Sequence, residues 1–201
     1  KTDCLIALGA RYAQHKSSRI LFLRTTYTDL RDVLDRMQVL YPAMGARWIA
    51  SEKRWEWPSG AVLELGYGAT LDQVNGMTGT QAGLHFDLII GDDLVNDQNY
   101  KTPGQLEATI ECVKDQMNLL RGEHAKYHFY GTIWNYNDAS GWLMNTPELA
   151  EHIRFLVLSC YTEGGDPVWP AQRSAKFLET QRAVLGSTKF AQQYLNQRLP
   201  D

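Results

Sequence analysis

The sequence lacks any apolar run near the roughly 20 residues that a helix needs to cross a bilayer. It also lacks a charged and then apolar leader, so we expect a soluble, unexported protein with no membrane partner. Cysteines are few: Cys4, Cys112 and Cys160 are far apart, in none of the paired spacings of zinc sites or disulfide frameworks. These absences favour a reducing cytosol.

Positive charge is not in excess either. The formal net charge is −3, which excludes an overall basic field, so any DNA contact must come from a local patch or from a part outside this chain. The sequence has no Gly-x-Ser-x-Gly elbow and no His-Glu-x-x-His helix, so hydrolases of those types have no support. His124 and His128 are four residues apart, but His128 lies in a predicted strand and no third ligand completes a metal site.

What the chain does contain is an alternation of helix and strand patterns. Its 201 residues, 44% of them hydrophobic, can bury one substantial core. Periodicity and chain breakers predict a helix over 2–14, a strand over 19–24, a helix over 28–40, a hairpin within 47–67, a strand over 86–90, a helix over 102–120 and a strand over 126–132. We therefore expect a single three-layer α/β domain over residues 1–201, with a mainly parallel sheet, helices on both faces and an antiparallel hairpin.

The hairpin is rich in tryptophan. Trp48, Trp55 and Trp57 lie around the turn Pro58-Ser59-Gly60. Such side chains can stack on nucleic-acid bases. Because large aromatic residues mostly serve burial, we favour a role in the core or at a sheet edge.

Two adjacent carboxylates follow the strand predicted at 86–90. This strand lacks the alternation of a half-exposed strand, apart from Asp87, and so predicts a parallel strand covered on both faces. Asp92 and Asp93 stand at its carboxyl end, where ligands bind in open α/β sheets. They suit a metal-bound nucleotide, with Asp92 holding Mg²⁺ through water and Asp93 orienting the attacking water. The usual catalytic residue at the second position is Glu, and the shorter Asp93 departs from that. The alternative to a metal site is that the two carboxylates form only a solvated acidic turn.

Other residues of the chain suit the same chemistry. Lys1 and Thr2 open the first predicted helix, where Lys1 would reach the β- and γ-phosphates and the Thr2 hydroxyl would hold Mg²⁺. Taken alone, this pair is more simply a solvated terminus. Arg24 could sense phosphate or form a surface ion pair. Gly131 and Thr132, at the end of the last predicted strand, could touch the γ-phosphate region and pass its loss to neighbouring elements.

These residues together resemble a known family. Lys1–Thr2, RILFLRTT, LELGYG, DLIIGDDL and YGTIWNYND resemble, in order, the motifs of the ATPase domain of tailed-phage terminase large subunits, the motors that package DNA into empty capsids. The stretch from about 165 to 201 is similar to the segment that closes that domain and leads to the nuclease domain. By this resemblance Lys1 and Thr2 match the end of the Walker A motif, Asp92 and Asp93 the Walker B carboxylates, and Gly131–Thr132 the coupling motif.

The resemblance implies a function and a set of partners. It implies ATP hydrolysis with Mg²⁺, coupled to translocation of double-stranded DNA into a procapsid in the host cytoplasm. The family suggests a portal protein and a small terminase subunit as partners. It also suggests that the protein assembles into a pentameric ring. The glycine-rich half of Walker A would precede Lys1 and an RNase H-like nuclease would follow Asp201, so we expect a fragment that is inactive alone.

Two alternatives remain open. One is a helicase-type nucleic-acid motor, which shares the same site. The other is a non-catalytic α/β interaction domain, in which the acidic pair is only a turn. The motor hypothesis requires that the start of the first helix lie within side-chain reach of Asp92 and Asp93, since one hydrated Mg²⁺ bridges only a short gap.

Overall fold

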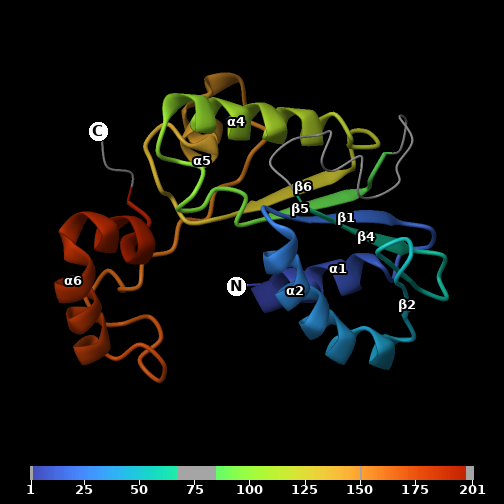
Figure 1. Cartoon of the computed structure of the whole chain (residues 1–201), viewed down its shortest axis with the longest axis horizontal. Helices are drawn as coiled ribbons and strands as arrows, with labels where there is room; N and C mark the ends of the chain where they lie inside the picture. The colour runs from blue at the N-terminus through green and yellow to red at the C-terminus, as the bar shows by residue number, and fades with distance from the viewer. Residues whose placement is uncertain (1, 68–84, 150, 198–201) are drawn as a thin grey trace. The chain divides into compact units, whose positions relative to one another are not determined.

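The computed structural model describes residues 2–67, 85–149 and 151–197 (Figure 1). These residues fall into two compact units. The first runs to Leu94 and resumes over Ala108–Gly131, and the second holds Val95–Glu107 and the described residues from Thr132 onward. The single domain expected over 1–201 stays a prediction.

A mixed sheet forms the centre of the first unit. The described residues give it six strands in the order β2-β3-β4-β1-β5-β6. The strands are β1 (Arg19–Arg24), β2 (Arg47–Ile49), β3 (Arg54–Glu56), β4 (Val62–Tyr67), β5 (Leu88–Asp92) and β6 (Lys126–Tyr130). Strands β4, β1, β5 and β6 are parallel to one another, whereas β2 and β3 pair antiparallel. The predicted mainly parallel sheet with an antiparallel hairpin is confirmed, and β2 extends the hairpin to three strands.

Helices cover both faces of this sheet (Figure 1). On one face lie α1 (Thr2–Tyr12) and α2 (Tyr27–Leu40), which pack with alternate residues of the strands, among them Ile20 and Phe22. On the other face lies α4 (Pro103–Met117), where the Tyr127 hydroxyl of β6 donates to Gln116 Oε1 at 2.7 Å. The predicted three-layer α/β arrangement is therefore present.

The tryptophans of the hairpin serve the core. Trp55 and Trp57 are 1% and 5% exposed and pack edge-on against Tyr41, with ring centroids 5.3 and 5.0 Å apart. The buried Tyr41 hydroxyl donates to the Ile6 carbonyl at 2.9 Å, which ties the end of α2 to α1. Burial, rather than base stacking, explains these two side chains.

The central strand is displaced from its predicted bounds. β5 covers Leu88–Asp92 and is buried throughout, whereas Phe86 forms only an isolated bridge to Leu120. The strand continues to Asp92 because Asp92 pairs with Tyr130 of β6. Asp92 therefore lies inside the sheet, and Asp93 is the first residue beyond it.

The second unit holds the rest of the described chain. Its helices are α5 (Ala139–Asn145) and α6 (Ala175–Phe190), with a 3-10 turn over Pro147–Leu149 and a π-helical turn over Ala191–Leu195. The Asp138 carboxylate begins α5 by accepting hydrogen bonds from the N–H groups of Trp134, Asn135 and Gly141. None of the described helices is both long and apolar enough to traverse a bilayer.

Two glycines of the second unit give a matched test of its packing. A Cβ on Gly141 would lie 1.9 Å from the Tyr136 carbonyl oxygen, whereas a Cβ on Gly104 would meet nothing within 4 Å. We expect Gly141→Ala to destabilise the protein by about 1–3 kcal/mol, because a backbone oxygen cannot move aside as a side chain can. Gly104→Ala should be neutral or stabilising by up to about 1 kcal/mol. Urea denaturation of both variants measures the difference, and equal midpoints would contradict the packing described here.

Candidate functional site

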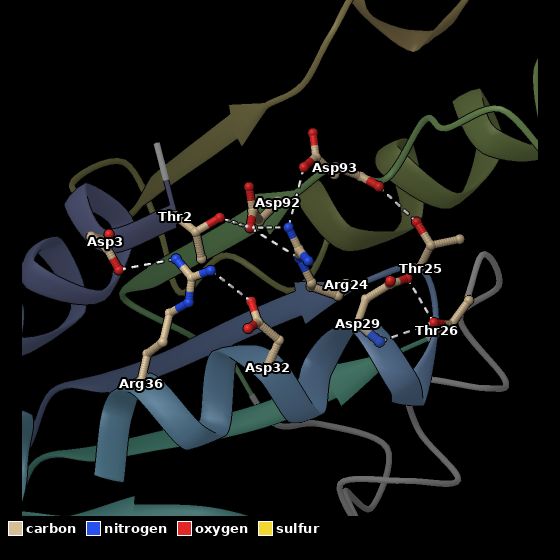
Figure 2. Close-up of polar contacts among 10 residues, drawn as sticks. All are labelled: Thr2, Asp3, Arg24, Thr25, Thr26, Asp29, Asp32, Arg36, Asp92 and Asp93. Carbon is tan, nitrogen blue, oxygen red and sulfur yellow. Dashed lines mark hydrogen bonds and ion pairs between the residues drawn. The ribbon is translucent and has the colours of Figure 1, made fainter. Parts of the chain in front are cut away.

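The start of α1 lies against the end of β5. Thr2 is the first described residue of α1, and its Oγ1 donates to Asp92 Oδ2 at 3.1 Å (Figure 2). The proximity that the motor hypothesis required is therefore present for Thr2. Lys1, the predicted phosphate-binding lysine, lies outside the described residues.

A single guanidinium bridges the two predicted carboxylates. Arg24 is the last residue of β1, the strand next to β5. Its Nε and Nη2 lie 3.0 and 2.8 Å from Asp92 Oδ2, and its Nη2 lies 3.1 Å from Asp93 Oδ2 (Figure 2). The Arg24 side chain is only 12% exposed and that of Asp92 is fully buried, whereas Asp93 remains 37% exposed. The ion pair considered for Arg24 thus forms in the interior rather than at the surface.

The two residues after Arg24 complete this corner of the sheet. The Thr25 hydroxyl donates to the Asp93 carbonyl oxygen at 2.7 Å. Thr26 begins α2 as its N-cap, because its Oγ1 accepts from Asp29 N at 3.2 Å and donates to Asp29 Oδ2 at 2.6 Å (Figure 2). The sequence analysis missed both roles, although a threonine three residues before an acidic residue is an N-cap signal.

Asp93 has an unusual backbone. Its φ of 50° lies in the left-handed region, which Asp and Asn tolerate better than most residues. Its N–H donates to the Tyr130 carbonyl at 2.9 Å, so the backbone is held by β6 on one side and by Thr25 on the other. Such strain persists only where the surroundings impose it, and it clusters at functional sites.

A second, exposed group of ion pairs lies beside the start of α1. Arg36 of α2 donates to Asp3 at 3.2 Å and lies 3.1 Å from Asp32 (Figure 2). All three side chains are 46% exposed or more. They provide a solvated counterpart to the buried pair of Arg24 and Asp92.

The predicted coupling residues follow β6. The strand ends at Tyr130, two residues earlier than expected, so Gly131 and Thr132 come directly after it. Gly131 ends the first unit and Thr132 begins the later segment of the second. The relay role of the two residues stays a prediction. His128 lies in β6, as predicted, and burial together with the Lys126 charge lowers the pKa of its imidazole.

The donors at this site fit a nucleotide-bound magnesium ion. A Thr2 hydroxyl and an Asp92 carboxylate are hard oxygen ligands of the kind that Mg²⁺ prefers, and Mg²⁺ is usually held by one or two carboxylates together with waters and substrate phosphates. Within the ranges that the structure describes, no group of three or more His, Cys, Asp or Glu residues could hold a metal ion. Thr2 and Asp92 would supply two oxygen ligands, and phosphate and water oxygens would supply the others.

Comparison with known proteins gives structural matches only. No protein-family model matches the sequence, and no curated protein matches it significantly. The large terminase of bacteriophage HK97 is similar in structure, with a TM-score of 0.64 and 13% identity over 98% of this chain and 43% of that one. The large terminase of a thermophilic bacteriophage, in complex with ADP, has a TM-score of 0.61 and 11% sequence identity, over 98% of this chain and 46% of that one. The ATPase domain of the Thermus phage P74-26 large terminase has a TM-score of 0.55 and 14% sequence identity, over 98% of this chain and 84% of that one.

These likenesses establish the fold. At 11–14% identity, the chain has the fold seen in phage large terminases and in the isolated ATPase domain of one of them. The fold expected from the resemblance is thus confirmed. The chain spans less than half the length of the HK97 terminase and of the ADP-bound terminase that it matches.

Stability measurements should separate the buried ion pair from the exposed one. Asp92→Ala removes the main partner of a nearly buried guanidinium, so we expect a loss of about 3 kcal/mol in the free energy of unfolding. Asp32→Ala removes a solvated partner of Arg36 and should cost about 0–1 kcal/mol. Chemical denaturation of both variants tests this, and a similar small loss in each would show that Asp92 is not held as described.

Proposed function

We propose that this chain is the ATPase part of a viral DNA-packaging motor, which hydrolyses ATP to translocate double-stranded DNA into a procapsid. The observation that supports it most is the hydrogen-bonded set of Thr2, Arg24, Asp92 and Asp93, at the carboxyl ends of β1 and β5 and beside the start of α1. The fold shared with phage large terminases supports the choice of motor.

The chain's own residues would divide the chemistry between them. The first N–H groups of α1 and the Lys1 ammonium would bind phosphate oxygens, because a helix start carries partial positive charge. Thr2 and Asp92 would hold the magnesium ion, which supplies neutralisation of charge on the β- and γ-phosphates. Asp93, the more exposed carboxylate, would accept a hydrogen bond from the attacking water and align it.

We also propose a route from the site toward the predicted coupling residues. The Asp93 N–H binds the last carbonyl of β6, and Gly131 follows it directly. Loss of the γ-phosphate would change the contacts of Asp93. Because Asp93 is hydrogen-bonded to Tyr130, this change would also shift the position of Gly131–Thr132. This path would convert hydrolysis into movement of a DNA-gripping surface.

The remaining proposals concern the complete protein. One of the similar terminases was determined with ADP, which supports a nucleotide as ligand here. We propose that the working protein acts in the host cytoplasm as a homo-oligomeric ring, with a portal protein and a small terminase subunit as partners. Because the chain covers less than half of the HK97 terminase and of the ADP-bound one, we propose that it needs its natural flanking sequence for activity.

ATPase kinetics of the natural full-length protein test this function. We expect Asp93→Asn to lower kcat by at least about 100-fold with little change in ADP affinity, because the amide cannot act as a base yet suits the left-handed backbone. Asp92→Asn should weaken binding of magnesium–ADP. The exposed change Asp32→Asn is the control and should leave both quantities unchanged.

Several results would reject the motor proposal. One is normal ATPase activity in Asp93→Asn, and another is the absence of any nucleotide binding by the wild-type protein. DNA strand separation without a capsid would instead favour a helicase-type motor, which uses the same site.

A further inference from the structure

We propose that Arg24 is the resident counter-cation of Asp92 and Asp93, and that it keeps divalent cations off these carboxylates until a nucleotide arrives. The identity of the incoming ligand rests on the proposed function. Arg24 is thereby a positioning residue, which acts on the site through the two carboxylates. In the nucleotide-free state, Arg24 thus restrains the metal site.

The contacts of Asp92 are the first observation that supports this role. Its Oδ2 accepts hydrogen bonds from Arg24 Nε at 3.0 Å and from Thr2 Oγ1 at 3.1 Å, and Arg24 Nη2 lies 2.8 Å from the same oxygen in an ion pair. A carboxylate oxygen offers about two lone-pair directions, and the donors from Arg24 and Thr2 occupy both of them. A metal ion or a metal-bound water could use Oδ2 only after Arg24 withdraws.

The burial of the ion pair between Arg24 and Asp92 is the second observation that supports this role. Asp92 is fully buried and the Arg24 side chain is 12% exposed, so charges here interact through protein more than through water. Salt screens such a pair weakly. A dication placed beside the carboxylate would also stand beside the guanidinium and be repelled by it. A magnesium nucleotide differs, because its phosphates add negative charge that can attract the guanidinium away from Asp92.

The same residue restrains Asp93. Arg24 Nη2 holds the Asp93 carboxylate at 3.1 Å, and Thr25 holds its carbonyl oxygen at 2.7 Å (Figure 2). A carboxylate in an ion pair is a weaker acceptor toward water than one without a cation beside it. Movement of Arg24 would therefore release Oδ2 of Asp92 and Oδ2 of Asp93 in one step. The site would be assembled only when both metal and phosphate are present.

Manganese titration of the natural full-length protein without nucleotide tests the proposal. Electron paramagnetic resonance of unbound Mn²⁺ gives the number and affinity of the sites. Arg24→Gln should show one additional site, or a site at least about tenfold tighter than in the wild type, because a repelling charge is gone. Arg36→Gln removes the exposed guanidinium nearby and should match the wild type. Equal Mn²⁺ binding in Arg24→Gln and the wild type would overturn the proposal.

A second measurement uses the wild-type protein and so does not depend on the folding of a variant. The Nε–H resonance of Arg24, assigned with Arg24→Lys, reports the contact with Asp92. It should be unmoved by Mg²⁺ alone and should shift when Mg²⁺ and ADP are added together. A shift with Mg²⁺ alone, or none when magnesium–ADP binds, would overturn the proposal. Failure of ADP to bind would instead reject the proposed function, while the Mn²⁺ titration would still decide the role of Arg24.

Discussion

The arrangement of this site depends on one constraint, which is that a carboxylate buried within a sheet must be paired. Asp92 is fully buried and lies within β5. An ionised side chain there is stable only with a cation and hydrogen-bond donors around it. Arg24 and Thr2 meet that need from the neighbouring strand and from the first turn of α1. The pairing of this one carboxylate thus joins β5 to segments that lie 68 and 90 residues away from Asp92 in sequence.

The end of β1 shows how closely fold and site are joined. Arg24 binds the carboxylates, Thr25 binds the backbone of Asp93, and Thr26 begins α2 as its N-cap. Three successive residues therefore end a strand, support the site and start the helix that packs on the sheet. A change in this turn would alter the packing of α2 and the geometry of Asp93 together, because the two share one short piece of backbone.

The sequence allowed most of the sheet, and part of the site, to be predicted. Strand β1 was predicted to the residue, because its apolar run is bounded by polar residues on both sides. The bounds of β5 were missed, because a buried strand gives no periodicity to mark its end, and pairing with Tyr130 extends it to Asp92. The contact between Arg24 and the carboxylates was also missed, since it depends on β1 and β5 being neighbours, a property of strand order rather than of local sequence.

The energetics of this corner argue against a purely structural acidic turn. A buried ion pair contributes little net stability compared with apolar residues of similar volume, because desolvation opposes the attraction of the charges. A left-handed Asp93 adds a further cost of about 1–3 kcal/mol. A domain selected for stability alone would place an apolar residue at Asp92 and a glycine at Asp93. Two costly features occur at consecutive positions whose carboxylates both contact Arg24, beside the start of a helix. This coincidence favours a site whose chemistry requires the two carboxylates.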